Sequence, residues 1–129
     1  MSKWDNVYWQ KRNMETSMKW YEDGDDRHKA NKRQPMNDIA SRFWYERDKI
    51  LLELIDKNVD KFLDVWRFSD IPTSYNVWPD MRMKACILGS NGRTLKAREL
   101  TDEELKNARN ILNKMVDDYI KDYRERLMR

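Results

Sequence analysis

The chain has 129 residues, enough for one domain with a hydrophobic core, and 40% apolar residues, which is ordinary for a globular protein. Charged residues make up 38% of the chain but nearly cancel to a net charge of +3, which argues against a protein that coats nucleic acid through bulk charge. Eight methionines and six tryptophans stand beside three glycines and three prolines, a composition that favours long helices.

The single cysteine and the N-terminal residues bear on the compartment. One cysteine excludes an internal disulfide and fits a reducing environment. The chain shows no apolar stretch of signal-peptide length at its start and no run of the ~18 apolar residues that cross a bilayer. We therefore expect a cytoplasmic protein without a membrane segment. Ten asparagines with abundant lysine suit an AT-rich coding genome, such as that of a bacteriophage.

Residues 2–22 are predicted to form a helix with two different faces. One face carries apolar residues at three- and four-residue steps, interrupted only by Lys11, a pattern typical of a face that packs on a core. This seam consists of Trp4, Val7, Met14, Met18 and Tyr21. Trp9 and Trp20 are eleven residues apart, about 1100° at roughly 100° per residue, so they share an azimuth on the opposite face.

That opposite face is the first candidate site, and it consists of Trp9, Asn13, Thr16 and Trp20. Large aromatic side chains that meet water indicate a surface for another molecule, and tryptophan is enriched at the centres of protein interfaces. We therefore predict that a protein partner docks here. The helix could instead be sandwiched between two layers, and its seam could pair with a second copy to form a homodimer. Acidic residues in the segment argue against a membrane surface.

Residues 23–35 are predicted to be a charged linker. Acidic residues around Gly24 are followed by a basic run, and the stretch has no apolar periodicity. On this interpretation residues 1–22 form a helical arm, and residues 36–129 form the body of the protein.

A long central helix is predicted to begin near Asn37 or Asp38, either of which could cap it. Apolar residues at three- and four-residue steps continue as far as Arg67. Asn58 could instead end one helix in the left-handed conformation and begin another. The sequence leaves both possibilities open.

Residues 81–98 are predicted to form a small β-hairpin, because apolar and polar residues alternate on both sides of a glycine-containing turn. A three-residue loop, residues 90–92 with Gly92 left-handed, would put the apolar side chains of both strands on one face. The segment contains five basic residues and no acidic one. They are Arg82, Lys84, Arg93, Lys96 and Arg98.

The last helix is predicted from a capping box, Thr101-x-x-Glu104, and from the apolar face that follows it. That face consists of Leu105, Ala108, Leu112, Met115, Val116, Tyr119 and Tyr123. A two-stranded hairpin is not stable alone and must lie on the helices. We therefore expect a mainly α fold with a small β-hairpin (α+β): an N-terminal helix, a long central helix, the hairpin and a long C-terminal helix.

The five basic residues of the hairpin are the second candidate site, for nucleic acid or for an acidic partner surface. Lys84 would face Arg98 across the strands, and like charges in that relation destabilise the pair unless an anion lies between them. Acidic side chains of the helices could also neutralise the patch internally. The patch lacks the aromatic residues with which single-strand binders stack bases.

Catalytic sites find little support. Pro79-Asp80 with Glu104-Leu105-Lys106 resembles the Pro-Asp…Glu-x-Lys pattern of restriction-type nucleases, in which two carboxylates hold a divalent metal and the lysine helps activate water. The capping box already explains Glu104, however. His28 and Cys86 are a formal nucleophile pair without an orienting third group, and one residue of each type excludes a Cys/His zinc site.

We therefore expect a non-enzymatic interaction or regulatory protein that needs no cofactor and no metal. It would dock on a larger macromolecular machine, such as the transcription apparatus, through its exposed aromatic residues and basic hairpin. Direct nucleic-acid binding by the hairpin is the first alternative. A metal-dependent nuclease that uses Asp80, Glu104 and Lys106 is the second.

Overall fold

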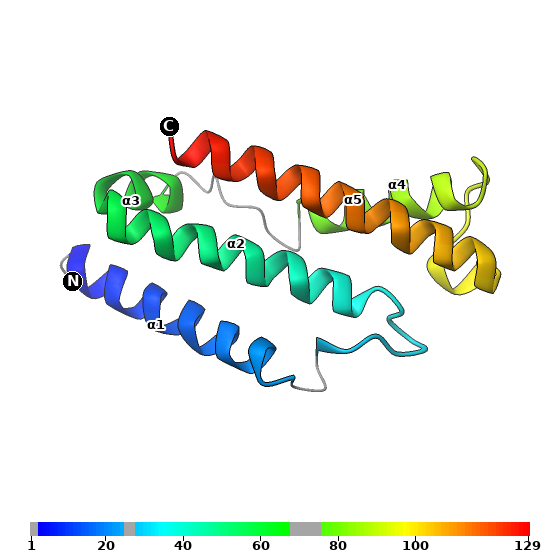
Figure 1. Ribbon diagram of the computed structural model, residues 1–129, viewed down its shortest axis with the longest axis horizontal. Helices are drawn as coiled ribbons and strands as arrows, with labels where there is room; N and C mark the ends of the chain where they lie inside the picture. The colour runs from blue at the N-terminus through cyan, green and yellow to red at the C-terminus, as the bar shows by residue number, and fades with distance from the viewer. Residues whose placement is uncertain (1–2, 25–27, 68–75) are drawn as a thin grey trace.

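The computed structural model describes residues 3–24, 28–67 and 76–129. This part of the chain is helical and contains no strand (Figure 1). Its elements are α1 (Lys3–Glu22), α2 (Asn37–Lys57), α3 (Val59–Arg67), α4 (Trp78–Gly89), the 3₁₀ turn η2 (Ala97–Glu99) and α5 (Asp102–Leu127). Residues 25–27 of the predicted linker lie outside the described residues.

Helix α1 has the two faces that its sequence predicts, and it runs antiparallel to α2 (Figure 1). Near its middle, Lys11 pairs with Asp56 at 4.0 Å, and near its end the ring of Tyr21 stacks on Tyr45 with centroids 4.5 Å apart. Two seam residues are buried in the core: Val7 and Met14. Helix α1 is therefore packed along the body, while the side chain of the seam residue Trp4 lies outside the described part.

Asn58 separates α2 from α3. Its backbone N–H donates to the carbonyl of Leu54 at 2.7 Å, and its own carbonyl accepts from the N–H of Phe62 at 3.1 Å. Its side-chain oxygen accepts from the N–H of Lys61 at 3.2 Å, which helps to cap α3. The break is therefore real, but the backbone of Asn58 is extended, with φ −157°, and is not left-handed.

Helices α2 and α5 run parallel, side by side (Figure 1). Three hydrogen-bonded pairs along this contact are 71 positions apart in the sequence: Asp38 with Arg109, Arg42 with Asn113, and Glu53 with Arg124. Arg42 also donates to the carboxylate of Asp117 at 2.7 Å. The prediction that Asn37 or Asp38 caps α2 is wrong, because Met36 occupies the N-cap position. Asp38 lies in the first turn, where its carboxylate binds the guanidinium of Arg109.

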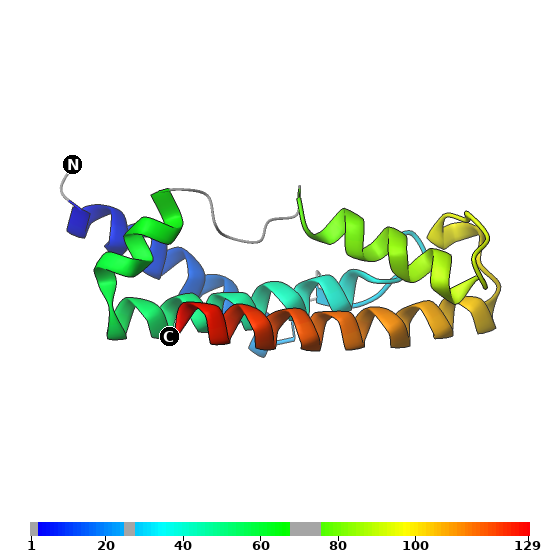
Figure 2. The same cartoon turned by 90° about the horizontal axis from the view of Figure 1, so that it is seen from above.

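Helix α4 runs antiparallel to the first half of α5, and the two backbones approach closely (Figure 2). A Cβ atom at Gly89 would lie 2.7 Å from the backbone nitrogen of Ala108 and 2.8 Å from its Cα. Ala85 and Ala108 are completely buried. Small residues on both helices therefore make this contact possible.

The prediction of a β-hairpin at residues 81–98 is wrong, because α4 covers the first half of that range and no strand is present in the described residues. The buried side chains follow a helical spacing of three and four, not the period of two that a strand requires. Met83 is 55% exposed, whereas a strand would have placed it beside buried Met81. Pro79 in the first turn of α4 and the shortage of β-branched residues were the signals for a helix.

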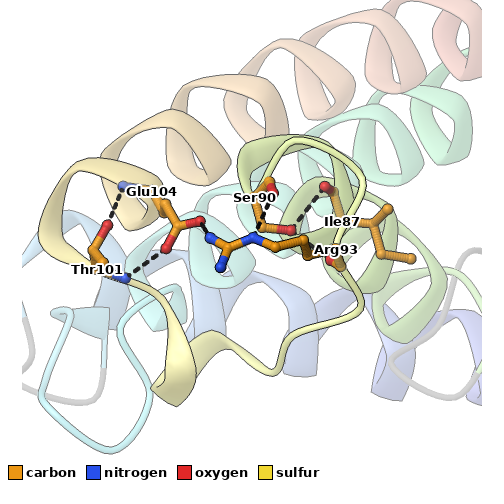
Figure 3. A network of polar contacts seen from close by, with 5 residues as sticks. All are labelled: Ile87, Ser90, Arg93, Thr101 and Glu104. Carbon is orange, nitrogen blue, oxygen red and sulfur yellow. Dashed lines mark hydrogen bonds and ion pairs between the residues drawn. The ribbon is translucent and has the colours of Figure 1, made fainter.

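A network of hydrogen bonds and one ion pair holds the connection between α4 and α5 in place (Figure 3). Ser90 is completely buried, and its hydroxyl donates to the carbonyl of Ile87 at 2.9 Å. Arg93 donates through Nε to the carbonyl of Ser90 at 3.2 Å and forms an ion pair with Glu104. Thr101 and Glu104 bond each other's backbone N–H at 3.1 Å, which confirms the predicted capping box.

The buried apolar residues form two clusters, to which both α2 and α5 contribute. One cluster also receives side chains from α1 and α3, and the other from α4. Figure 2 shows α3 and α4 at opposite ends of the long α2–α5 pair. Among the described residues, no helix is both long and apolar enough to cross a membrane.

Candidate functional site

The structure brings the four residues of the first candidate site together on the outer side of α1. Trp9 is 51% exposed and Trp20 is 45% exposed, and Asn13 and Thr16 between them are exposed as well. The hydroxyl of Thr16 donates to the carbonyl of Arg12 at 2.9 Å, so its methyl group is the part left to the surface. We call these four residues, together with Tyr8, the aromatic face.

Tyr8 was missed in the sequence, although it adjoins Trp9. It is 56% exposed, and its ring meets that of Trp9 edge to face, with centroids 5.3 Å apart and planes at 76°. The guanidinium of Arg12 lies 5.8 Å from the centroid of Trp9, and its Nη1 is 3.5 Å from the hydroxyl of Tyr8. Arg12 can contact both rings because it follows Trp9 by three positions and Tyr8 by four, and residues at these spacings are neighbours on a helix. Its contacts hold both rings in place.

The side of the aromatic face that continues from Tyr8 is positively charged. An open depression there is lined by Tyr8, Lys11, Arg12, Glu15, Thr16 and Lys19. Three of these side chains are basic and one is acidic. A molecule that covers the aromatic rings therefore meets a positive rim.

The second candidate site is dispersed, because a helix replaces the first strand. Arg82 and Lys84 are two positions apart, about 200° around α4, so they point in different directions. Lys84 pairs with Asp80 at 3.0 Å, and Arg93 pairs with Glu104. The predicted juxtaposition of Lys84 and Arg98 across two strands is wrong.

Arg82 instead lines a pocket of about 180 Å³ that the sequence did not indicate. Arg33 from the linker lines the same pocket, and Trp78 and Ala97 form part of its wall. The remaining two predicted basic residues, Lys96 and Arg98, flank Ala97 in the chain. We call this site the basic pocket; it joins two basic segments that are far apart in the sequence.

The residues of the possible nuclease site do not come together. Asp80 shares a surface depression with Asp118 and Asp122 of α5. Glu104 and Lys106 lie at the other end of that helix: at a rise of 1.5 Å per residue, Glu104 is about 21 Å from Asp118. Within the described ranges, no group of three His, Cys, Asp or Glu side chains is arranged to hold a metal ion.

Cys86 and His28 are packed side chains. Cys86 is buried in the α4 cluster, and burial raises the pKa of its thiol. The ring of His28 meets Tyr21 edge to face with centroids 5.4 Å apart, at the end of α1. A thiol whose pKa is raised is a poor nucleophile, so its role is that of a small apolar residue.

Comparison with protein-family models, with curated proteins and with solved structures finds no match to this chain. Two features of the surface are candidate binding sites: the aromatic face of α1 and the basic pocket between the linker, α2 and α4.

Proposed function

We propose that this protein is an interaction protein that binds a partner protein through the aromatic face of α1. The observation that carries this proposal is the exposure of Tyr8, Trp9 and Trp20 on a helix whose other side is packed into the core. Large aromatic residues are common anchors of protein interfaces, and a small number of such anchors contributes most of the binding energy. Binding to a larger assembly, and thereby altering or blocking it, would be the activity.

The aromatic face is held ready for binding. Val7 and Met14 fix α1 to the body from its inner side, and Tyr21 stacks on Tyr45 near its end. Trp9 has two ring or cation contacts in the free protein. A helix that is already folded and side chains that are already ordered lose little conformational entropy on binding.

The charges beside the rings favour an acidic partner surface with an apolar centre. Arg12 and Lys19 outnumber Glu15 in the depression next to Tyr8, where the third basic side chain, Lys11, pairs with Asp56. A second copy of the chain that docked face to face would bring these basic side chains toward the same set, and like charges disfavour such a pairing. We therefore propose a different, acidic protein as the occupant.

Site-specific photo-crosslinking tests where the partner binds. A photoreactive residue at Asn13, between the two tryptophans, should capture a partner from the native lysate, while the same residue at Met83 on α4 should not. Met83 is a matched control because it is also exposed and apolar but lies on another helix. Capture at both positions, or at neither, would contradict the proposal.

Two double variants measure the contribution of the rings. Trp9→Ala with Trp20→Ala should weaken binding of the captured partner at least 100-fold, because each anchor contributes about 2 kcal/mol. Met83→Ala with Leu88→Ala also removes two exposed apolar side chains and should leave the affinity unchanged. Sedimentation of the purified protein completes the test, since self-association lost with the tryptophans would identify a second copy as the occupant.

A further inference from the structure

The basic pocket is formed by three segments that the fold brings together: the end of the linker with the start of α2, the first turns of α4, and η2. Arg33 and Gln34 come from the first segment, Trp78 and Arg82 from the second, and Ala97 from the third. The pocket shares no residue with the aromatic face.

Hydrogen bonds fix the linker segment that carries Arg33. The side-chain oxygen of Asn31 accepts from the backbone N–H groups of Arg33 and Gln34, at 2.9 and 2.8 Å. Arg109 of α5 donates to the carbonyl of Pro35, which ties the segment to the body. The backbone at Arg33 is therefore positioned before any ligand arrives.

The charge of the pocket is positive. Two of its lining residues, Arg33 and Arg82, are exposed arginines, and neither forms an ion pair with another described residue. None of the residues that line it is acidic. The carboxylate nearest in sequence, Asp38, is already bound by both nitrogens of Arg109, at 2.9 and 2.7 Å. No negatively charged side chain of the lining would therefore repel an anion in the pocket.

The size of the pocket limits what it can hold. Its volume of about 180 Å³ is below the roughly 300 Å³ at which sites for whole organic ligands begin. The enclosed volume suits a phosphate group, and the rest of a nucleotide would lie outside it. Trp78 and Met36 are buried and form an apolar part of the wall, where the field of an arginine is screened less than in water.

We propose that the basic pocket binds a phosphate group through the guanidinium groups of Arg33 and Arg82, as presented by the backbone of a nucleic acid. Guanidinium groups match the geometry of phosphate oxygens, and two of them at one site can hold a single phosphate from both sides. The same chemistry would accept a free phosphate, and the experiment separates the two sources. Lys96 and Arg98 beside Ala97 offer contacts to neighbouring phosphates of a longer strand.

The first measurement is the fluorescence anisotropy of a labelled single-stranded 12-mer oligonucleotide mixed with the full chain at 50 and 200 mM salt. Arg33→Gln with Arg82→Gln should weaken binding at least 10-fold and reduce the steepness of the salt dependence by about 0.7, because about 0.7 counterions are released per phosphate contact and the two arginines hold one phosphate. Arg129→Gln is the control: it removes one positive charge at the C-terminus, at the other end of the molecule (Figure 1).

The second measurement is local and uses inorganic phosphate. Titration should shift the NMR signal of the Trp78 indole N–H in the native chain but not in the double variant. A shift with phosphate and no affinity for the oligonucleotide would support the pocket and assign it to a small phosphate compound.

Three results would overturn the proposal: no response to either ligand, an equal loss of affinity in Arg129→Gln, or an unchanged Trp78 signal while the oligonucleotide still binds. The variants alter exposed side chains, and circular dichroism should show unchanged helix content. The outcome is separate from that for the aromatic face, since Trp9→Ala with Trp20→Ala leaves every residue of the pocket in place.

Discussion

Helix α5 contacts its two neighbours, α4 and α2, in different ways. Against α4 it runs antiparallel, and the backbones are so close that Gly89 has no room for a side chain beside Ala108. Against α2 it runs parallel, and charged pairs line the contact. The contact with α4 requires a residue without a side chain at position 89, and the contact with α2 depends on pairs of opposite charge. Different substitutions should therefore disrupt the two contacts.

The charged pairs also fix how α2 and α5 are aligned. A slip of one helical turn toward the start of α5 would place Arg42 beside Arg109, two like charges, instead of beside Asn113 and Asp117. A slip in either direction also separates Asp38 from Arg109 and Glu53 from Arg124, so the observed alignment is the best one. At the α4 contact the close approach of Gly89 and Ala108 has the same effect, because a shift would bring larger side chains between the backbones.

The largest effect is expected at the close contact. Gly89→Ala places a methyl group 2.7 to 2.8 Å from backbone atoms of Ala108, which have no freedom to move aside. The helices must separate, and we expect a loss of about 2 kcal/mol in the free energy of unfolding, measured in urea.

The neighbouring exposed residue provides the control for that measurement. Leu88 is 59% exposed, so Leu88→Ala should change the free energy of unfolding by about 0.5 kcal/mol or less. Alanine has the higher helix propensity, by about 1 kcal/mol, so a more stable Gly89→Ala protein would show that the two helices are not in close contact.

A smaller effect is expected at the contact between α2 and α5. Asp38 and Arg109 form a bidentate pair, but their side chains are 36% and 28% exposed, so solvent screens the attraction. A double-mutant cycle with Asp38→Asn and Arg109→Gln should give a coupling energy of about 1 kcal/mol.

An exposed pair within one helix is the comparison for that cycle. Asp80 and Lys84 of α4 form an ion pair at 3.0 Å, with both side chains more than half exposed. Their coupling should be about 0.3 to 0.5 kcal/mol. Equal couplings in both cycles would mean that the pair between the helices does not select their alignment.

The smallest effect is expected from Glu53, whose side chain is one-third exposed. The guanidinium of Arg124 and then the ammonium of Lys57 lower its pKa from the ordinary value of 4.5 to about 2. Because the folded pKa is the lower one, this group stabilises the protein above about pH 4.5, and that contribution is lost as the pH falls toward 2. Glu53→Gln should therefore flatten the acid side of the stability profile, measured by thermal unfolding at constant ionic strength.

Asp48 should act in the opposite sense. It is buried in α2, and desolvation raises its pKa although Arg47 pairs with it at 2.8 Å. Its contribution to stability is therefore lost as the pH rises through its folded pKa.

If Glu53→Gln steepened the acid side of the profile, the pair with Arg124 would not stabilise the fold.

Part of the candidate sites could be predicted from the sequence. The azimuth of Trp9 and Trp20 follows from the helical repeat alone, and the structure finds both exposed. The basic pocket could not be predicted, because Arg33 and Arg82 are 49 positions apart and nothing local relates them. Only the packing of the linker against α4 brings them to one pocket.

The sequence by itself determined the elements whose signals are local. The capping box at Thr101 and the apolar face behind it specify α5, and the seam around Val7 specifies α1, since each signal lies within a few turns of one helix. Residues 78–89 were decided by the tertiary structure. Both a strand and a helix fit their short apolar pattern, but only a helix lets Ala85 and Gly89 pack closely on Ala108 of α5.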